Sequence, residues 1–462
     1  MSRYMPYLKY EAQDIEGLEV LPSNWEVKQV RYILKDGAEG IKIGPFGSAL
    51  KLEDMVEKGF RVYGQENVIK KDFTLGKRKI SDIKFREMEV YKIFPQDILI
   101  TMMGTSGKCA IVPDDVSEGI IDSHLLRVRV KPEYIRPEFF KLLIDESPEI
   151  AYQIKIQGKG SIMHGLNSGI VKSLFLPVPS TEEQDFILSF LDHETAKIDT
   201  LIDKQQRLIK LLKEKRQAVI SYAVTKGLNP DAPMKDSGVE WLGEVPDHWD
   251  VSRLKFECEV VDCRNKTPEY FESGEYFVVR TTNVKKQKLN FNGALYTDKK
   301  NFDIWTQRGV PPSGSILFTR EAPTGEVCLV PDNLKFCMGQ RMMNFISNSQ
   351  AYTNYLFDYL ISDCLDRYIN SVSHGSTVSH LRVEQVENIP VPVPPESELI
   401  AIHEHISKLK KQYDATESNA LKAIDLMKER RTALISSAVT GKIDVRNWQA
   451  PVNQEVLQQE AS

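Results

Sequence analysis

Two stretches of this 462-residue chain concentrate positive charge in a way that suits phosphate binding. Residues 70–86 carry seven basic and two acidic side chains, and residues 280–302 carry six basic and one acidic. Lysine and arginine can neutralise DNA phosphates there, while Asn, Gln and Arg can read base edges. A solvated strand-and-turn surface is the alternative for any single residue. Because the whole chain has a net charge of −5 and a pI near 6.0, a nucleic-acid surface would have to be local.

The expected DNA contacts come from these stretches and from a glycine-containing loop that follows a strand in each half. The two loops differ, because Met102 and Met103 in the first correspond to Arg320 and Glu321 in the second. The two loops would therefore present different side chains to a ligand. The expected contacts are Lys70, Lys71, Lys77, Arg78, Lys79, Thr105, Ser106, Lys108, Arg280, Asn283, Lys285, Lys286, Lys288, Arg320 and Thr324.

Motifs of enzymes that act on DNA are missing from the sequence. An adenine methyltransferase needs a Pro-Pro-aromatic loop, but the Pro-Pro pairs here are followed by Ser313 and Glu396. The GTSGK run at 104–108 lacks the spacing of a phosphate-binding P-loop. His403 and His405 are two apart on an expected helix and point to different faces, so they are a poor metal pair. We expect no catalytic residue, metal ligand or cofactor in this chain.

The chain is internally duplicated. Residues 213–225 (KEKRQAVISYAVT) return as residues 428–440 (KERRTALISSAVT), with nine of thirteen positions identical at an offset of 215. Earlier matches have offsets of up to 224, a drift that small loop insertions would produce. These matches predict strands around a glycine-containing loop in each half. The further matched pairs are 18–30 with 242–254, 65–73 with 281–289, 96–114 with 314–332, and 160–166 with 375–381.

A long helix is expected at the end of each half. Proline-rich segments at 177–179 and 390–395 are followed by acidic residues, which favour a helix N-terminus. Apolar residues at 4-3 spacing then continue for about five heptads, which indicates a coiled coil, although a long amphipathic helix on a globular core is the alternative. If the helices pair antiparallel, the globular parts lie at opposite ends and each helix ends beside the other half, so that 213–225 and 428–440 would support the domain they do not belong to. The expected seam is Ile187, Leu191, Ile198, Leu201, Leu208, Leu212, Val219, Ile402, Ile406, Leu409, Tyr413, Ala420, Ala423, Met427 and Leu434.

In their order and duplication these features resemble the specificity subunit of type I restriction–modification systems. The resemblance rests on the Pro-x-x-Trp openings at Pro22 and Pro246, the D-I-L…G…G strand-loop at 97–107, and the repeated helix ends. It also rests on GPFGSALK at 44–51 and on the G-S…L-P-V-P run that follows residue 160.

The resemblance implies an α+β fold with two target recognition domains, separated by two long antiparallel coiled-coil helices in a pseudo-two-fold duplication. Each domain would read half of a split double-stranded DNA sequence, and the helices would set the spacer. The subunit itself would be non-catalytic. Its implied partners are two methyltransferase subunits, which bind S-adenosylmethionine, and restriction/translocase subunits, which use ATP and Mg.

The sequence contains no signal-peptide core and no run of eighteen apolar residues, so we expect a cytoplasmic protein without membrane contact. Two other functions stay open: a self-contained DNA enzyme, which the missing motifs disfavour, and a coiled-coil scaffold whose globular ends bind proteins. The expected division is 1–180 first recognition domain, 181–226 first helix, 227–245 linker, 246–395 second recognition domain, 396–441 second helix and 442–462 tail.

Overall fold

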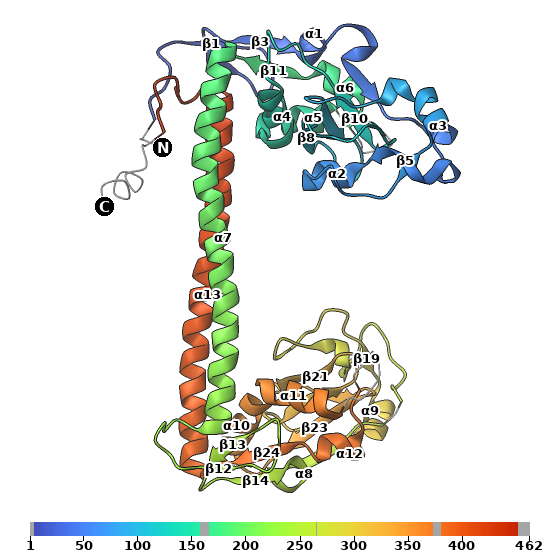
Figure 1. Cartoon of the computed structure of the whole chain (residues 1–462). Helices are drawn as coiled ribbons and strands as arrows, with labels where there is room; N and C mark the ends of the chain where they lie inside the picture. Colours follow the sequence, from blue (N-terminus) through green and yellow to red (C-terminus); the bar gives the residue numbers. More distant parts are fainter. Residues whose placement is uncertain (1–3, 158–165, 265, 373–379, 451–462) are drawn as a thin grey trace. The chain divides into compact units, whose positions relative to one another are not determined.

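The computed structural model describes residues 4–157, 166–264, 266–372 and 380–450. The chain forms two compact units, residues 1–204 with 423–462 and residues 205–422. Each unit holds one globular part, the beginning of one long helix and the end of the other (Figure 1). Unit 1 is therefore built from the two ends of the chain, and unit 2 from the stretch between them. Of the matched segments 160–166 and 375–381, all but Leu166, His380 and Leu381 lie outside the described residues.

The first globular part is a mixture of short strands and helices. Its strands are β1 (Tyr10–Ala12), β2 (Val20–Pro22), β3 (Glu26–Gln29), β4 (Ile41–Ile43), β5 (Met55–Tyr63), β6 (Lys79–Ile80), β7 (Ile98–Thr101), β8 (Cys109–Ile111), β9 (Gly119–Ile121), β10 (Leu125–Val128) and β11 (Phe175–Val178). Its helices are α1 (Val30–Ile33), α2 (Gln65–Lys70), α3 (Asp82–Glu87), α4 (Pro137–Glu146), α5 (Pro148–Gln157) and α6 (Ser168–Ser173), and the long helix α7 (Thr181–Lys226) follows.

The second globular part repeats this mixture. Its strands are β12 (Met234–Asp236), β13 (Glu244–Pro246), β14 (Asp250–Arg253), β15 (Glu259–Asp262), β16 (Tyr276–Val279), β17 (Val284–Lys285), β18 (Lys288–Leu289), β19 (Tyr296–Thr297), β20 (Ile316–Arg320), β21 (Thr324–Leu329), β22 (Phe336–Met338), β23 (Met342–Ile346) and β24 (Pro390–Val393). Its helices are α8 (Leu254–Glu257), α9 (Lys299–Trp305), α10 (Gln350–Leu360), α11 (Asp363–Val372) and α12 (Val383–Glu387), and the long helix α13 (Glu396–Val439) follows.

The sheets of the two halves have the same topology. The antiparallel sheet β4-β10-β7-β8 corresponds to β15-β23-β20-β21. The sheet β6-β5-β9 corresponds to β19-β16-β22, and in both cases the central strand is parallel to the last one. The pairs β3–β11 and β14–β24 also match. The duplication expected from the sequence is confirmed in these sheets, although among the described residues the hairpin β17–β18 occurs only in the second half, and the chain is an α+β protein.

The segment between α7 and β13 is more than a linker. It contains β12, which pairs with β13 in the register in which β1 pairs with β2. A glycine with positive φ follows the end of each long helix: Gly227 (φ 74°) comes directly after α7, and Gly441 (φ 66°) lies two residues after α13. A Cβ on Gly227 would lie 3.2 Å from the Trp249 ring, and one on Gly441 would lie 2.3 Å from Pro22. Glycine therefore both ends each helix and lets it meet the Pro-x-x-Trp turn closely.

The end of each long helix packs into the core of the other half. In unit 1 the last turns of α13 join the core of the first globular part, and in unit 2 the last turns of α7 join the core of the second. The expectation that the repeated helix ends support the domain they do not belong to is confirmed. The buried side chains are Ile435, Ala438 and Val439 in unit 1, and the equivalent Ile220, Ala223 and Val224 in unit 2.

The tryptophan of each Pro-x-x-Trp turn holds the first turn of the following long helix. Trp25 Nε1 donates to Glu183 Oε1 at 3.0 Å, and Trp249 Nε1 donates to Glu398 Oε2 at 3.0 Å. Both carboxylates also interact favourably with the positive, N-terminal end of the helix dipole. Glu183 is buried and accepts further hydrogen bonds from Tyr7 and from Asn24, whereas Glu398 has His248 as its second partner, with Nε2 2.6 Å from Oε1.

Within each unit the two helix segments run antiparallel. In unit 2, Lys213 pairs with Glu417 at 3.2 Å and Arg216 pairs with Asp414 at 2.7 Å, so partner numbers fall in α13 as they rise in α7. In unit 1, Asp199 pairs with Arg431 of α13 at 3.0 Å. Both helices carry apolar positions on their contact faces, as the 4-3 pattern indicates.

The buried stripe drifts away from part of the expected seam. Leu201 is 46% exposed and Leu208 is 39% exposed, whereas Ile202 is buried at 8% and Ile424 at 5%. A strict seven-residue spacing falls behind the 3.6-residue turn of a straight helix by about 20° per heptad, so the contact moves to the next residue. Of the other expected seam residues, some are fully buried: Ile187, Leu191, Ile198, Ile402, Ile406 and Ala420. The rest are half-buried: Leu212, Val219, Leu409, Tyr413, Ala423, Met427 and Leu434.

None of the helices in the described part of the chain is both long enough and apolar enough to span a bilayer.

Candidate nucleic-acid interface

A buried asparagine holds the start of the basic stretch in each half. Asn67 Oδ1 accepts from the backbone N–H of Gly64 at 2.9 Å, and Asn283 Oδ1 accepts from that of Arg280 at 3.0 Å. The amide of Asn283 donates to the carbonyl of Asn290, and both asparagines are 1% exposed. Asn283 was expected to contact DNA. Its polar atoms are instead committed to its own loop, so it positions the neighbouring lysines.

In unit 1 the first basic stretch surrounds β6. Lys70 and Lys77 are exposed, and Lys79 is half-buried. Arg78 Nη2 lies 2.8 Å from Asp122 Oδ2, so part of its charge is already compensated. The exposed lysines are the groups best placed to meet phosphates from solution.

The loop between β7 and β8 carries three further expected contacts. Thr105 and Ser106 are exposed at its tip. Lys108 Nζ lies 2.7 Å from Asp145 Oδ1, which directs this ammonium group toward α4. A hydrogen bond joins the two ends of the loop, because the buried Thr101 hydroxyl accepts from the backbone N–H of Lys108 at 3.0 Å. The two hydroxyls at the tip can offer hydrogen bonds to a duplex.

In the equivalent loop between β20 and β21, contacts of Arg320 hold the backbone in place. Arg320 Nη2 lies 3.3 Å from Asp262 Oδ1, and the Thr324 hydroxyl donates to the Arg320 carbonyl at 3.2 Å. Burial raises the pKa of the Asp262 carboxyl, and the charge of Arg320 opposes that shift. Glu321, next along the loop, pairs with Arg341 at 2.8 Å. Arg320 and Thr324 therefore shape the loop, and the more exposed Arg341 was missed by the sequence reasoning.

The second basic stretch includes a tight hairpin, β17–β18. Lys285, Lys286 and Lys288 are exposed along it. At its tip, Lys286 (φ 52°) and Gln287 (φ 64°) are both left-handed, as a type I′ turn requires. The Arg280 guanidinium donates through Nη2 to the Gly293 carbonyl at 2.9 Å, so it also holds the loop that follows.

Each unit has a cavity where its globular part meets the helix pair. The first has a volume of about 710 Å³ and the second about 790 Å³. They occupy equivalent places, since Arg431 and Pro113 line the first where Arg216 and Pro331 line the second. Of the expected DNA contacts, Lys71 lines the first cavity, and Lys286 and Lys288 of the β17–β18 hairpin line the second.

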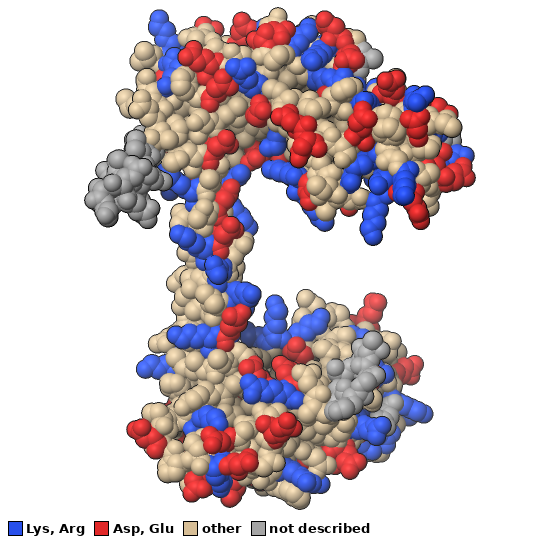
Figure 2. Space-filling view, in the orientation of Figure 1, with Lys and Arg blue, Asp and Glu red and all other residues tan. Residues whose placement is uncertain are grey.

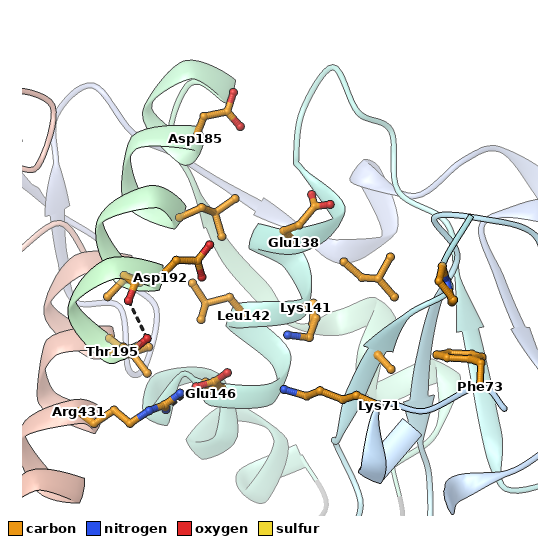
Figure 3. A pocket seen from close by; sticks show the side chains of 16 residues that line it. Lys71, Phe73, Glu138, Lys141, Leu142, Glu146, Asp185, Asp192, Thr195 and Arg431 are labelled. Atoms are coloured by element: carbon orange, nitrogen blue, oxygen red, sulfur yellow. Dashed lines mark hydrogen bonds and ion pairs between the residues drawn. The ribbon is translucent and has the colours of Figure 1, made fainter. Parts of the chain in front are cut away.

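The first cavity is close to neutral. Figure 3 shows Lys71 and Lys141 reaching into it and Arg431 turned toward Glu146. The Arg431–Glu146 pair is 2.6 Å long. Its charged lining residues are Lys71, Lys141 and Arg431 against Glu138, Glu146, Asp185 and Asp192.

The second cavity is cationic. Among its lining residues one carboxylate, Asp414, is paired with Arg216. Lys410 extends from α13 and donates to Gln287 Oε1 at 3.0 Å. The basic lining residues are Arg216, Lys286, Lys288 and Lys410. Arg216 and Lys410 were not expected as DNA contacts, although the repeated Arg216 and Arg431 in the two helix ends were a usable signal.

Nothing in the described part of the chain suggests a metal centre. No group of three or more His, Cys, Asp or Glu residues there is arranged to hold a metal ion. The six cysteines are all buried and unpaired with one another. Burial raises the pKa of the Cys258, Cys328 and Cys337 thiols to about 12, which makes them unreactive at neutral pH.

Comparison with known proteins agrees with this geometry. A family model described as a type I restriction modification DNA specificity domain matches residues 46–211 and again residues 246–425. The type I restriction enzyme MjaVIII specificity subunit of Methanocaldococcus jannaschii is 23% identical over 453 residues, which cover 96% of this chain and 98% of that one.

Two solved structures share the fold across nearly the whole chain. The HsdS subunit from Thermoanaerobacter tengcongensis has 15% identity and a TM-score of 0.53, over 92% of this chain and 98% of that one. A chain from a structural study of complex assembly in the type I R-M system has 16% identity and a TM-score of 0.60, over 92% of this chain and 99% of that one.

Because the family model covers most of the chain and matches it twice, the protein belongs to the type I restriction–modification DNA specificity family, as a specificity subunit and not as an enzyme.

Proposed function

We propose that each unit reads one half of a two-part double-stranded DNA site and that α7 and α13 set the distance between the halves. The observation that carries this proposal is one architecture used twice with different surface residues. Thr105 and Ser106 are exposed on the β7–β8 loop, whereas Glu321 and Arg341 form an ion pair at the β20–β21 loop. Two similar scaffolds with different contact residues suit two different half-sites.

The backbone contacts would come from exposed lysines. Lys70 and Lys77 in unit 1, and Lys285 and Lys286 in unit 2, can neutralise phosphates and fix the position of each reader. The loops would then meet base edges. This division of work agrees with a chain of net charge −5 that keeps its positive charge local.

We further propose that the subunit acts inside a larger complex in the cytoplasm. Two methyltransferase subunits would bind S-adenosylmethionine and methylate adenine at the site chosen by this subunit. Restriction/translocase subunits, using ATP and Mg, would complete the complex. The specificity subunit would then need no cofactor of its own.

Binding to duplex DNA at several salt concentrations, followed by mapping of methylated sites, tests the proposal. The full chain with its methyltransferase subunits should bind duplex DNA with an affinity that falls steeply as salt rises. Genome-wide methylation mapping should return one two-part motif with a fixed spacer. Absence of duplex binding at low salt, with the methyltransferase subunits present, would support the alternative in which the globular ends bind only proteins.

A further inference from the structure

The β17–β18 hairpin carries an unfavourable pair of residues at its tip. A type I′ turn strongly prefers Asn-Gly, because both central residues have positive φ, yet this turn uses Lys286 and Gln287. Long side chains adopt left-handed backbone at a cost, and such residues persist where the surroundings hold them. Glu326 Oε2 accepts from the Lys286 backbone N–H at 3.2 Å, and Lys410 holds the Gln287 side chain. A poor turn pair kept in place by neighbours indicates that these side chains are used.

Positive charge converges on this hairpin from three elements. Lys286 and Lys288 come from the hairpin, Lys410 comes from α13, and Arg216 comes from α7. Figure 2 shows Lys and Arg side chains gathered where the helices meet the globular part of this unit. Since the one lining carboxylate, Asp414, is paired with Arg216, the three lysines are left without a carboxylate partner in the cavity lining.

The best buried of these lysines has a poorly compensated charge. Lys410 Nζ lies 5.5 Å from the centre of the Phe357 ring, and its hydrogen-bond partner is the neutral amide of Gln287. Burial lowers the pKa of Lys410, and the charge of Asp358 opposes the shift. An anion entering the cavity would stabilise this ammonium group.

The remaining lining suits the sugar part of a nucleic acid. Apolar side chains line the cavity beside the lysines, and Phe291 is 50% exposed. The DNA backbone alternates an anionic phosphate with a less polar sugar, and roughly half to two-thirds of protein–DNA hydrogen bonds go to these two groups. The apolar lining residues are Leu289, Phe291, Leu329, Pro331 and Phe357.

The equivalent cavity in unit 1 lacks this character. It holds four carboxylates against three cations, and Arg431 is paired with Glu146. The net charges of the helix segments differ between the units in the same direction. Those of unit 1 carry nine acidic and five basic residues, a net charge of −4, whereas those of unit 2 carry ten basic and six acidic, a net charge of +4. The architecture is shared, so the charge is specific to unit 2.

We propose that the cationic cavity formed by Lys286, Lys288 and Lys410 binds the sugar–phosphate backbone of the duplex beside the half-site read by unit 2. This proposal rests on the proposed function, because it assumes that unit 2 meets DNA at all. It adds a contact that unit 1 does not make, from residues of the long helix as well as of the globular part.

The test uses the full chain in complex with its methyltransferase subunits and a duplex that carries its mapped site. One variant combines Lys286→Asn with Gln287→Gly, and a second is Lys410→Gln. Each removes one positive charge, so the slope of log affinity against log salt should become shallower by about 0.9. At 0.15 M salt the affinity should fall roughly fivefold for each variant.

Thermal unfolding separates this role from a structural one. The Asn-Gly pair fits the left-handed turn better than the native pair, so the unfolding midpoint of the hairpin variant should not fall below that of the wild type. Lower DNA affinity together with an equal or higher midpoint supports the proposal. A lower midpoint with an unchanged salt slope shows a structural role and overturns it.

Lys408→Gln is the matched control for Lys410→Gln. It removes the same charge from α13, but two positions along a helix turn the side chain by about 200°, away from the cavity. Its salt slope should match that of the wild type. Equal effects of the two substitutions would show general electrostatics and overturn the proposal.

Two further outcomes have distinct meanings. Variants that bind duplex as the wild type does but lose methyltransferase subunits would identify a protein-docking surface and overturn the proposal. Failure of the wild-type complex to bind any duplex would instead defeat the proposed function itself, and this inference with it.

Discussion

The two halves of the chain share their architecture but differ in electrostatics. Both have a cavity between the globular part and the helix pair, and an arginine at the same repeat position lines each one. In unit 1 that arginine, Arg431, pairs with Glu146 and Asp199, whereas in unit 2 Arg216 pairs with Asp414 alone. The charge of the cavity lining is near neutral in unit 1 and cationic in unit 2. Packing has been retained through the duplication, while the charges that a ligand would meet have diverged.

What the halves share is the way that each long helix is held. Equivalent tryptophans donate to equivalent glutamates at the helix starts, and equivalent Ile, Ala and Val side chains are buried at the helix ends. These contacts need close packing, which tolerates few replacements. Surface lysines and carboxylates carry no such constraint, so they are free to encode different half-sites.

Shortening both long helices tests whether the shared part of the structure acts as a spacer. Deleting seven residues from each, for example 203–209 and 420–426, keeps the helical phase nearly unchanged and shortens the pair by about 10 Å. Binding to the original site should be lost, and methylation mapping should return the same half-sites about 3 base pairs closer together. A changed half-site, or an unchanged spacer, would show that the helices do not set the distance.

Removing one of the equivalent tryptophans should damage its own unit most. Trp249 is fully buried, and Trp249→Ala should cost about 3–5 kcal/mol of stability through the cavity it leaves. Limited proteolysis should then cleave within residues 246–395 faster, while residues 18–178 keep their resistance. Trp25→Ala is the reciprocal variant and should reverse the pattern. Equal sensitivity of both regions to either change would show that the units are not independent.

Neutralising two lysines of the first basic stretch should weaken binding without changing the recognised sequence. Lys77→Gln combined with Lys79→Gln removes two expected phosphate contacts, so the salt slope should fall by about 2 and the affinity at 0.15 M salt by roughly 30-fold. Arg78→Gln should alter the slope less, because Arg78 is paired with Asp122. A change in the methylated motif would instead assign these lysines to base reading.

The smallest expected effect is a difference in the loss of stability when one or the other of the two repeated arginines, Arg431 and Arg216, is replaced. Arg431→Gln leaves Glu146 and Asp199 without their shared partner and should cost about 1 kcal/mol, whereas Arg216→Gln frees only Asp414 and should cost less than about 0.5 kcal/mol. Urea unfolding midpoints of the two variants give this comparison. A larger cost for Arg216→Gln would contradict the view that Arg431, with its two carboxylate partners, contributes more to stability than Arg216.

Much of the fold could be predicted from the sequence because each element expected in one half could be checked against the matching segment of the other. Matching segments fixed equivalent elements in the two halves, and proline followed by acidic residues marked the starts of α7 at Thr181 and α13 at Glu396. The burial of the repeated helix ends in the opposite half also followed, since an antiparallel pair brings each end to the other domain. These inferences depend on pattern and chain direction, which a sequence displays.

Features that depend on packing could not be predicted in this way. Leu201 and Ile202 are both apolar, and only the pitch of the paired helices decides which is buried. Asn283 looks like a base reader, but its burial against its own loop is visible only in three dimensions. The short strand β12 has no alternating pattern of its own, because it is defined by its partner β13.

The candidate DNA surface was predicted only in part for a related reason. Sequence windows found lysines that are close together along the chain, such as Lys286 and Lys288. They could not find Lys410, which joins them from α13 more than a hundred residues later. Long-range convergence of this kind is decided by the fold.

The most direct test of two independent readers is an exchange of Leu18–Val178 for the equivalent region of a relative with a known site, followed by genome-wide mapping of methylated bases. We predict that one half of the recognised sequence changes to that of the relative, while the other half and the spacer stay as they were. If both halves change together, or if neither changes, the central claim that each unit reads its own half-site is wrong.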